Sequence, residues 1–153
     1  HNHFIAAAEY EAALTADAEN PVSTRLRFET PAAALLADDP GLAAAWSPAL
    51  KASGLIESGY TVQPEKRRAE ITAHLRAPNQ LDAEAHPVIA AEVLAVEERP
   101  MTVETRTYAY AARIKMTVRG RSVERDVAAD IAFDGDGALT IEAVGDFAFT
   151  EFG

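Results

Sequence analysis

Residues 107–120, TYAYAARIKMTVRG, show the most regular alternation of apolar and polar side chains in the chain. Because successive side chains of a β-strand point to opposite faces of a sheet, this period of two predicts a half-buried strand over 106–119. We expect the apolar set to be buried and the polar set to be exposed. The inward set is Tyr108, Tyr110, Ala112, Ile114, Met116 and Val118, and the outward set is Arg113, Lys115, Thr117 and Arg119.

The same kind of pattern recurs over most of the chain. Further strands are predicted over 2–16, 22–32, 87–98, 123–133 and 138–152, with turn residues between them. Six or more long antiparallel strands with polar outer faces are typical of a barrel or a strongly curved sheet. The sequence therefore predicts a mainly β protein, antiparallel throughout.

One helical insertion interrupts the strands. It is predicted over about 41–52, where Asp38 or Asp39 can cap and Pro40 suits the first turn, and over about 64–77. Proline in a helix interior removes a hydrogen bond, so Pro48 is expected to break the first segment.

Composition excludes several classes of function. The chain has 153 residues, enough for one domain with its own core. Its net charge of −10 argues against nucleic acid and against electrostatic docking on anionic membranes. It has no cysteine, which excludes disulfides and zinc–thiolate sites. No apolar run approaches the roughly 18 residues of a membrane span, and no signal peptide occurs in these residues.

The positions predicted to face inward are mostly aromatic or alanine. Rings combined with very small side chains make an internal cavity one of two candidates, in which Ala6, Ala8, Ala12 and Ala112 leave room. The alternative is a filled core in which neighbouring rings occupy those gaps. The candidate ligand-binding residues are Phe4, Tyr10, Phe28, Tyr108, Tyr110, Ile114, Met116, Phe133, Phe147 and Phe149.

Three segments, in order, resemble the YceI-like, polyisoprenoid-binding family. The first is HLRAPNQLDAEAHPVI, where a helix ends in His-Leu-Arg and a turn leads through Leu-Asp to His-Pro. The second is MTVRGRSVERDV, which is similar to the family's Leu-Thr-Ile-x-Gly-x-Thr hairpin. The third is the ending Thr-Glu-Phe-Gly, similar to the family's Asp-Phe-Gly. The matching residues are His74, Leu75, Arg76, Leu81, Asp82, His86, Pro87, Thr117, Val118, Gly120, Ser122 and 150–153.

The resemblance implies a single lipocalin-like barrel domain over 1–153. It implies a periplasmic or secreted protein that holds a long apolar ligand, such as an isoprenoid, a quinone or a fatty-acid-like lipid. It implies no catalytic residues, no metal and no cofactor besides such a lipid. The family's opening Trp-x-Ile-Asp strand is absent, and the family continues beyond Asp-Phe-Gly. Either the barrel is open and its ligand differs, or the domain is trimmed at both ends.

Open edges have a consequence for partners. Strands 2–16 and 138–152 are candidates for unpaired edges, which invite pairing with another chain. We therefore expect a homodimer, or a strand supplied by a segment outside these residues. Two other functions stay open: a small cavity enzyme of isomerase type, and an interaction domain with a filled core. Against the enzyme, Asp126 and Asp130 are predicted to point outward, away from the tyrosines.

Three polar clusters have structural interpretations beside functional ones. The segment 74–93 carries two histidines, three acids and an arginine, and we interpret it as a structural corner in which Arg76 could pair with Asp82 or Glu84. The segment 1–3, His-Asn-His, could ligate Cu(II) or Ni(II) if His1 carried a free amino group, but a strand is favoured. The segment 134–137, Asp-Gly-Asp-Gly, lacks the other ligands of a calcium loop and is interpreted as a hairpin turn.

Overall fold

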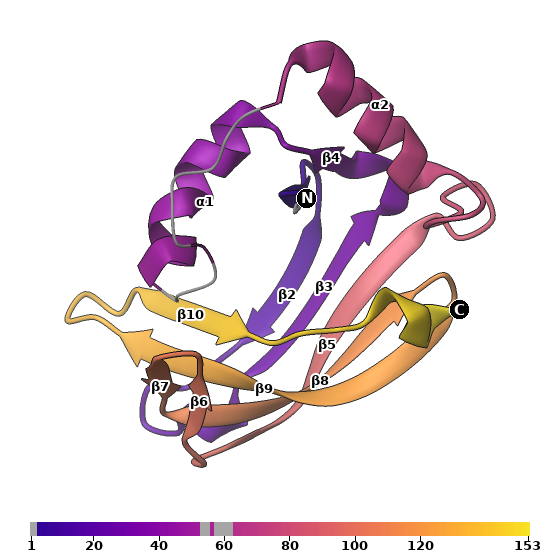
Figure 1. The fold of residues 1–153 in the computed structure, drawn as a ribbon. Coiled ribbons are helices and arrows are strands. Elements are labelled where there is room, and N and C mark those ends of the chain that lie inside the picture. The colour runs from indigo at the N-terminus through magenta and orange to yellow at the C-terminus, as the bar shows by residue number, and fades with distance from the viewer. Residues whose placement is uncertain (1–2, 53–55, 57–62) are drawn as a thin grey trace.

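A six-stranded antiparallel sheet, curled into a half-barrel, forms the centre of the molecule (Figure 1). The computed structural model describes residues 3–52, 56 and 63–153. The strand order is β10-β9-β8-β5-β3-β2, so β2 and β10 are its edges. The strands are β2 (Glu11–Thr15), β3 (Arg25–Pro31), β5 (Val88–Glu97), β8 (Tyr110–Val118), β9 (Arg121–Phe133) and β10 (Leu139–Val144). The predicted mainly β, antiparallel curved sheet is confirmed, with its two open edges.

Two small ribbons complete the β structure of the described residues. One pairs β1 (Ile5–Ala7) with β4 (Leu35–Ala37), and the other pairs β6 (Met101–Val103) with β7 (Arg106–Tyr108). Three short 3₁₀ turns lie between or after the strands, over Pro21–Ser23, Ala32–Ala34 and Phe149–Phe152.

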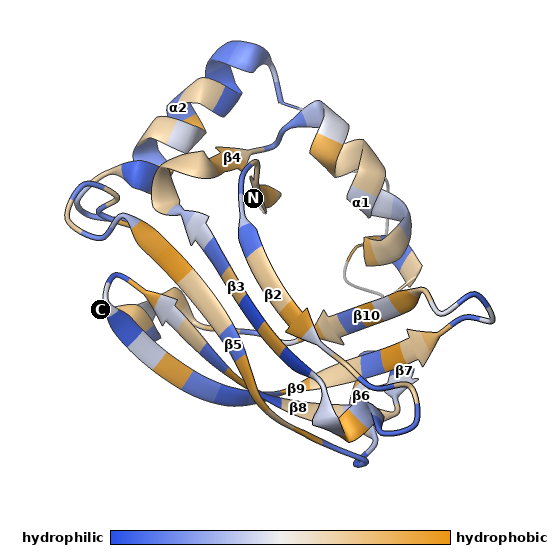
Figure 2. Cartoon of the chain, turned by 180° about the vertical axis from the view of Figure 1, so that it is seen from behind, coloured by the Kyte–Doolittle hydropathy of each residue, from blue (hydrophilic) through white to orange (hydrophobic). Residues whose placement is uncertain are grey.

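The pairing of β8 with β9 gives the sheet two distinct faces. Ala112 lies opposite Val127 on the concave face, and Arg113 lies opposite Asp126 on the convex face. Arg113 Nε donates to Asp126 Oδ1 over 2.5 Å, and this hydrogen bond holds the pKa of the Asp126 carboxyl below its usual value. Orange and blue segments alternate along the strands in Figure 2, as a period of two requires. The predicted strand is confirmed over 110–118, with Asp126 and Asp130 on the convex face.

Exposure on β8 is less extreme than predicted. Arg113 is exposed, but Lys115, Thr117 and Arg119 are half-buried, as are Tyr110, Ile114 and Met116 on the other face. The hairpin to β9 turns on Arg119 and Gly120, with φ of +52° and +70°. A two-residue turn with positive φ at both positions matches the right-handed twist of the strands it joins.

Two predicted strands are wrong in their extent. The strand expected over 2–16 divides at residues 8–10, so β1 pairs with β4 while β2 pairs with β3. Ala8 N donates to the Ala34 carbonyl over 3.0 Å at this division. The strand expected over 138–152 ends at Val144. A Cβ on Gly145 would lie 2.3 Å from Val127 Cγ1, so the chain leaves β10 in close contact with the concave face.

The two helices lie on the concave side of the half-barrel (Figure 1). They are α1 (Pro40–Ala52) and α2 (Glu65–Arg76), close to the predicted bounds. Asp39 Oδ1 caps α1 by accepting from the amides of Gly41 and Leu42 at 3.0 Å each. The predicted break at Pro48 is wrong, because α1 continues through it. Ala44, whose carbonyl loses its helical donor to Pro48, is exposed to water.

The described core consists of three clusters. On the concave face, the first contains Val96, Ala112, Val127 and Ala129, and the second contains Leu81, Val118 and Phe152. The third, which we call the outer cluster, contains Tyr108, Ala128 and Val144, with Met101 and Val103 of β6 packed against it. Ala128 alternates with Val127 and Ala129 along β9, so the outer cluster lies on the convex face.

The corner after α2 is held mainly by backbone hydrogen bonds. Asp82 has φ of +50°; its amide donates to the Ala77 carbonyl over 3.0 Å, and its carbonyl accepts from His86 N over 2.8 Å. The expected pairing of Arg76 with Asp82 or Glu84 is wrong, since Arg76 Nη2 donates to the Leu35 carbonyl at 2.9 Å. Arg76 therefore fastens α2 to β4.

The hairpin between β9 and β10 turns at residues 134–138. Asp134 Oδ1 accepts from the amides of Asp136 and Ala138 at 3.0 and 2.8 Å. The carboxylate is thus engaged in shaping the turn, as the turn interpretation of this segment requires.

Candidate ligand-binding cavity

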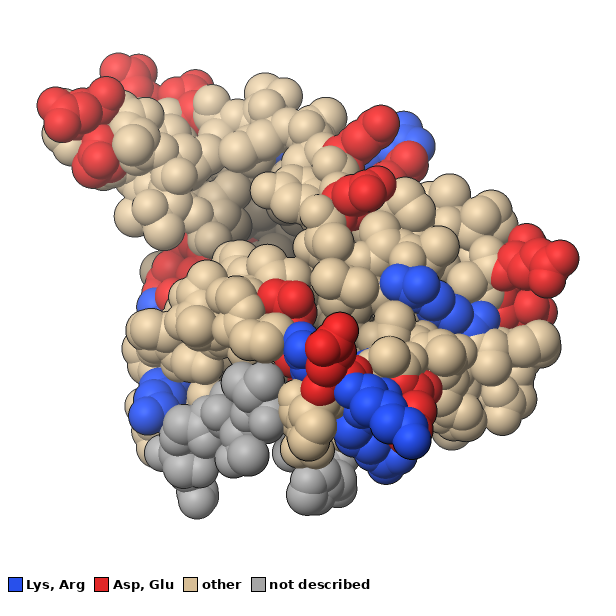
Figure 3. Space-filling view, turned by 90° about the horizontal axis from the view of Figure 1, so that it is seen from above, with Lys and Arg blue, Asp and Glu red and all other residues tan. Residues whose placement is uncertain are grey.

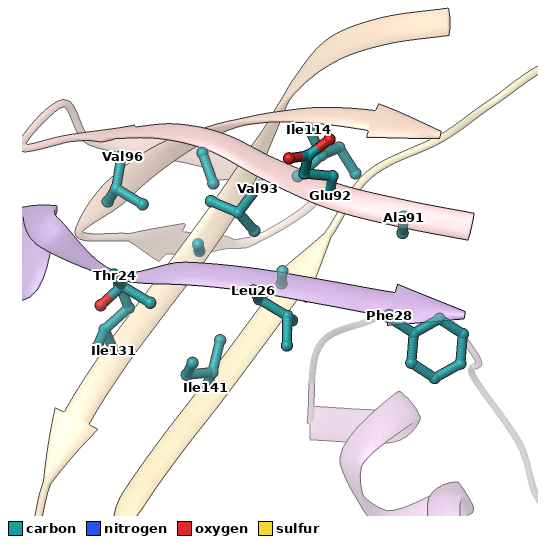
Figure 4. Close-up of a pocket in the computed structure, with 13 residues that line it drawn as sticks. Thr24, Leu26, Phe28, Ala91, Glu92, Val93, Val96, Ile114, Ile131 and Ile141 are labelled. Atoms are coloured by element: carbon teal, nitrogen blue, oxygen red, sulfur yellow. The ribbon is translucent and has the colours of Figure 1, made fainter. Parts of the chain in front are cut away.

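The concave face of the half-barrel holds a cavity of about 230 Å³ (Figure 4). Five strands of the sheet contribute to its wall. The lining residues are Thr24, Leu26, Phe28, Ala91, Glu92, Val93, Val96, Ala112, Ile114, Ala129, Ile131, Ile141 and Ala143. Seen from above, the surface is hollowed between the helices and the sheet (Figure 3).

The wall of the cavity is apolar because side chains alternate between the two faces along each strand, which places the charged side chains on the convex face. Glu92 is the one charged residue in the lining, and it lies opposite Arg27 on β3 and Lys115 on β8. Glu92 is exposed. The pKa of the Arg27 guanidinium is raised mainly by its hydrogen bond to Glu29 and by the charge of Glu29, and the charge of Glu92 adds a smaller effect in the same direction. These charged side chains share the convex face, so the cavity itself suits a neutral, apolar guest.

Thr24 is the other polar residue in the lining, and its hydroxyl has no hydrogen-bond partner. The residue is 2% exposed and stands just before β3. Its Oγ1 is buried and makes no hydrogen bond with any described group. Leaving a buried hydroxyl unpaired costs about 1–3 kcal/mol. This threonine is therefore a local defect in an otherwise apolar wall.

Five of the ten candidate ligand-binding residues lie in or beside the cavity wall on the concave face. Phe28 and Ile114 line the cavity. Tyr110 and Phe147 are half-buried against the first cluster, and Met116 is half-buried against the second. Whether any of them contacts a ligand stays a prediction.

The other five do not line the cavity. Tyr108 is fully buried in the outer cluster, on the opposite face from Tyr110, so its predicted inward orientation is wrong. Tyr10 is 63% exposed just before edge strand β2, although its ring stacks on Phe28 at 5.4 Å. Phe149 lies in a 3₁₀ turn and is 41% exposed. Phe4 and Phe133 are half-buried outside the lining.

The alanines that we expected to leave room in the cavity also lie partly in its wall and partly outside it. Ala112 is 4% exposed and lines the cavity. Ala8 and Ala12 are exposed and Ala6 is half-buried, all outside the lining. They lie in or between β1 and β2, into which the predicted single strand 2–16 divides.

Arg125 is a concave-face residue that the strand patterns did not single out. It alternates with Val123 and Val127 along β9, so its side chain starts on the apolar face. Its guanidinium lies 5.4 Å from the Phe147 ring centre, donates to the Asp146 carbonyl at 2.8 Å, and pairs with the Glu151 carboxylate. Arg125 therefore holds residues 146–151 across the concave face with its charge already neutralised.

The predicted metal interpretation of the first three residues falls partly outside the described residues, which exclude His1 and Asn2. His3 Nδ1 lies 2.8 Å from Asp38 Oδ2, and Asp38 Oδ1 accepts from Phe4 N at 2.8 Å. Asp38 is fully buried with φ of +53°, and it joins β1 to the start of the helical insertion. Within residues 3–52, 56 and 63–153, no group of three or more metal-ligating side chains is found.

Comparison with known proteins identifies the fold. No family model and no curated protein matches the sequence. The described helices include none long and apolar enough to cross a membrane. Among solved structures, BcnA of Burkholderia cenocepacia aligns with a TM-score of 0.62 at 12% identity, over 97% of this chain and 70% of that one. A YceI protein of Campylobacter jejuni aligns with a TM-score of 0.59 at 13% identity, over 99% and 71%.

Both alignments cover nearly the whole chain. At such low identity they establish architecture, and the architecture is the one that the three sequence segments implied. The chain has the fold of the YceI proteins, and its resemblance to that family is confirmed at the level of the fold.

Proposed function

We propose that this protein binds a long apolar ligand, of isoprenoid, quinone or fatty-acid-like type, in its half-barrel without catalysing a reaction. The observation that carries the proposal is the apolar cavity of about 230 Å³ on the concave face. The YceI fold supports it, because the family resemblance implies the same ligand class. Burying apolar ligand surface supplies roughly 0.8 kcal/mol per methylene, so the cavity needs no charged anchor.

The volume limits how much of the ligand can be enclosed. A cavity of roughly 150 Å³ holds one benzene molecule, and by that ratio this one holds roughly nine carbon atoms. A longer chain must leave the cavity. The end at Phe28 suits this exit, because the ring that stacks on it, Tyr10, is 63% exposed, whereas Thr24 at the other end is 2% exposed.

Two neighbouring alanines on β8 allow a matched test. Ala112 is 4% exposed and lines the cavity, whereas Ala111 is 2% exposed and points to the convex face. In Ala112→Phe the new ring occupies ligand space, so lipid uptake should be lost with little change in the melting temperature. In Ala111→Phe the ring has no cavity to fill, so overpacking should cost about 1–3 kcal/mol while the folded protein still takes up lipid.

The measurements are thermal melting and uptake of a fluorescent fatty acid or an isoprenoid quinone, made side by side. A wild-type protein that takes up neither lipid, together with a marked loss of stability in Ala112→Phe, would show that the concave core is filled. The binding proposal would then be wrong.

Two further expectations belong to the proposal. Edge strands β2 and β10 favour a homodimer, which light scattering of the purified protein would detect as twice the chain mass. A periplasmic or secreted location follows from the family resemblance, and cell fractionation tests it.

A further inference from the structure

The unpaired hydroxyl of Thr24 defines the chemistry of the ligand that the cavity accepts. We infer that the enclosed end of the ligand carries one neutral hydrogen-bonding group, a hydroxyl or a carbonyl, and that Thr24 Oγ1 bonds to it. This inference rests on the proposed function and specifies its ligand class. A threonine hydroxyl can donate to a carbonyl or accept from a hydroxyl, so either group can form the hydrogen bond that Thr24 lacks.

The position of Thr24 places that group at the closed end of the cavity. Thr24, Leu26 and Phe28 all line the cavity, with Thr24 and Phe28 four residues apart (Figure 4). At about 3.3 Å per residue, these two side chains mark ends separated by roughly 13 Å. Threonine carries a methyl and a hydroxyl on one carbon, and rotation about χ1 can bring the hydroxyl into the position that the methyl occupies. Because Oγ1 has no partner to lose, this rotation can turn it toward a ligand.

Water is a poor substitute for the ligand at this point. A buried water needs about two to four polar partners. The backbone of Thr24 is already engaged, since its amide donates to the Pro21 carbonyl over 3.1 Å and its carbonyl accepts from Arg25 Nη1 over 2.8 Å. The rest of the wall is apolar apart from Glu92, whose side chain lies on the convex face.

A charged ligand end is excluded by the same wall. A buried carboxylate or phosphate requires a paired cation or several donors. The concave-face cation Arg125 is already bonded to the Asp146 carbonyl and the Glu151 carboxylate, and Arg27 lies on the convex face with Glu29. A fatty alcohol, a ketone or a quinone ring meets these requirements, whereas an ionised fatty acid would have to leave its carboxylate outside.

The test compares short ligands of matched size with a nearly isosteric substitution. Nonane, 2-octanone, 1-octanol and octanoate are titrated calorimetrically into wild-type protein and Thr24→Val at neutral pH. The methyl signals of Ala112 and Ala129 report by NMR that binding is in the cavity. Thr24→Val should weaken 2-octanone and 1-octanol about three- to tenfold, the worth of one hydrogen bond, and leave nonane unchanged.

Two control variants separate this effect from a general loss of a buried threonine. Thr24→Ser keeps the hydroxyl and should keep the preference for the alcohol and the ketone. Thr30 is 3% exposed and lies outside the cavity lining, and Thr30→Val removes a hydroxyl that is bonded to the Glu9 carbonyl at 2.7 Å. It should lower stability and leave all four affinities unchanged.

The outcomes distinguish a failure of the inference about Thr24 from a failure of the proposed function. Equal weakening of nonane and 2-octanone in Thr24→Val, or no weakening of either, overturns the inference and leaves apolar binding intact. Octanoate binding as tightly as 1-octanol, with its carboxylate end in the cavity, also overturns it. If wild-type protein binds none of the four, the proposed function itself fails.

Discussion

The two faces of the sheet are buried in different ways. On the convex face, Tyr108 is fully buried and its neighbours satisfy its polar atoms: Arg106 lies 4.5 Å above the ring, and the hydroxyl lies 3.5 Å from Glu142 Oε1. On the concave face, a cavity of about 230 Å³ remains and the Thr24 hydroxyl is unpaired.

This difference separates a structural core from the cavity in which we propose that a ligand binds. Protein interiors are normally packed without voids and with their polar groups paired. In the outer cluster Tyr108 is fully buried and the neighbouring polar groups are paired, with Arg106 donating to Glu142 at 2.8 Å and to Asp130 at 3.0 Å. The cavity meets neither condition, although both regions share β9 and β10. Burial raises the pKa of the Tyr108 hydroxyl, so this group stays neutral at physiological pH.

The largest effect is expected from Tyr108→Ala, which removes the buried ring from the outer cluster on the convex face. Removing a fully buried ring should cost about 3–5 kcal/mol in the free energy of unfolding, measured by urea denaturation. Tyr10→Ala is the control, since that ring is 63% exposed and should cost less than about 1 kcal/mol. Equal losses in the two variants would contradict the assignment of Tyr108 to a packed core.

A smaller effect is expected where the chain crosses the concave face. Gly145→Ala would place a Cβ 2.3 Å from Val127 Cγ1, so the crossing segment must shift, at about 1–3 kcal/mol. Gly135→Ala, where a Cβ would meet nothing within 4 Å, should change stability by less than about 0.5 kcal/mol. Urea denaturation of both variants measures the difference, and a neutral Gly145→Ala would show that this contact is loose.

Arg106→Gln should have a smaller effect again, because the side chain is about one-third exposed. We expect a loss of stability smaller than that of Gly145→Ala, which shrinks in high salt because its two ion pairs are partly screened. Lipid uptake should not change, since Arg106 lies on the face opposite the cavity. A variant as stable as wild type at low salt would refute a stabilising role for these pairs.

The smallest effect is expected at Asp126, and it depends on pH. Hydrogen bonding to Arg113 lowers the carboxyl pKa from its ordinary value of 3.8 in the folded state. The resulting stability is present above that value and is lost as pH falls through the lower, folded-state pKa. Relative to wild type, Asp126→Asn should lose less than about 1 kcal/mol at pH 7, since the pair is partly exposed. The difference should disappear in acid; a constant difference down to pH 2 would contradict it.

The fold was predictable from sequence where alternation is unbroken. On β8, Ala112, Ile114 and Met116 follow the predicted period, and both helices lie close to their predicted bounds. Prediction failed for Tyr108 because the strand is interrupted at Ala109, whose amide donates to Asp130 Oδ1 over 2.8 Å. That long-range bond lets β6 and β7 fold onto the convex face, and no local pattern encodes it.

The candidate site was harder to predict than the fold. Aromatic residues suggested the cavity wall, but aliphatic side chains such as Val93, Ile131 and Ile141 form most of it. The sequence pattern predicted the strands that carry these residues but did not distinguish a cavity wall from a packed core. Thr24 gave no signal, because a single threonine before a strand is common and only its unpaired, buried hydroxyl distinguishes it.

For the proposed ligand-binding function, the free edges of the sheet bear on how strictly the thickness of a ligand would be selected. In a closed barrel, a continuous ladder of hydrogen bonds fixes the circumference. No such ladder joins β2 to β10 in the described part of this chain. Strand pairing therefore does not fix the distance between β2 and β10, and the half-barrel could widen without breaking a strand pair. A half-barrel that widens in this way would accept thicker or branched ligands, whereas a closed barrel would fit ligands of one thickness.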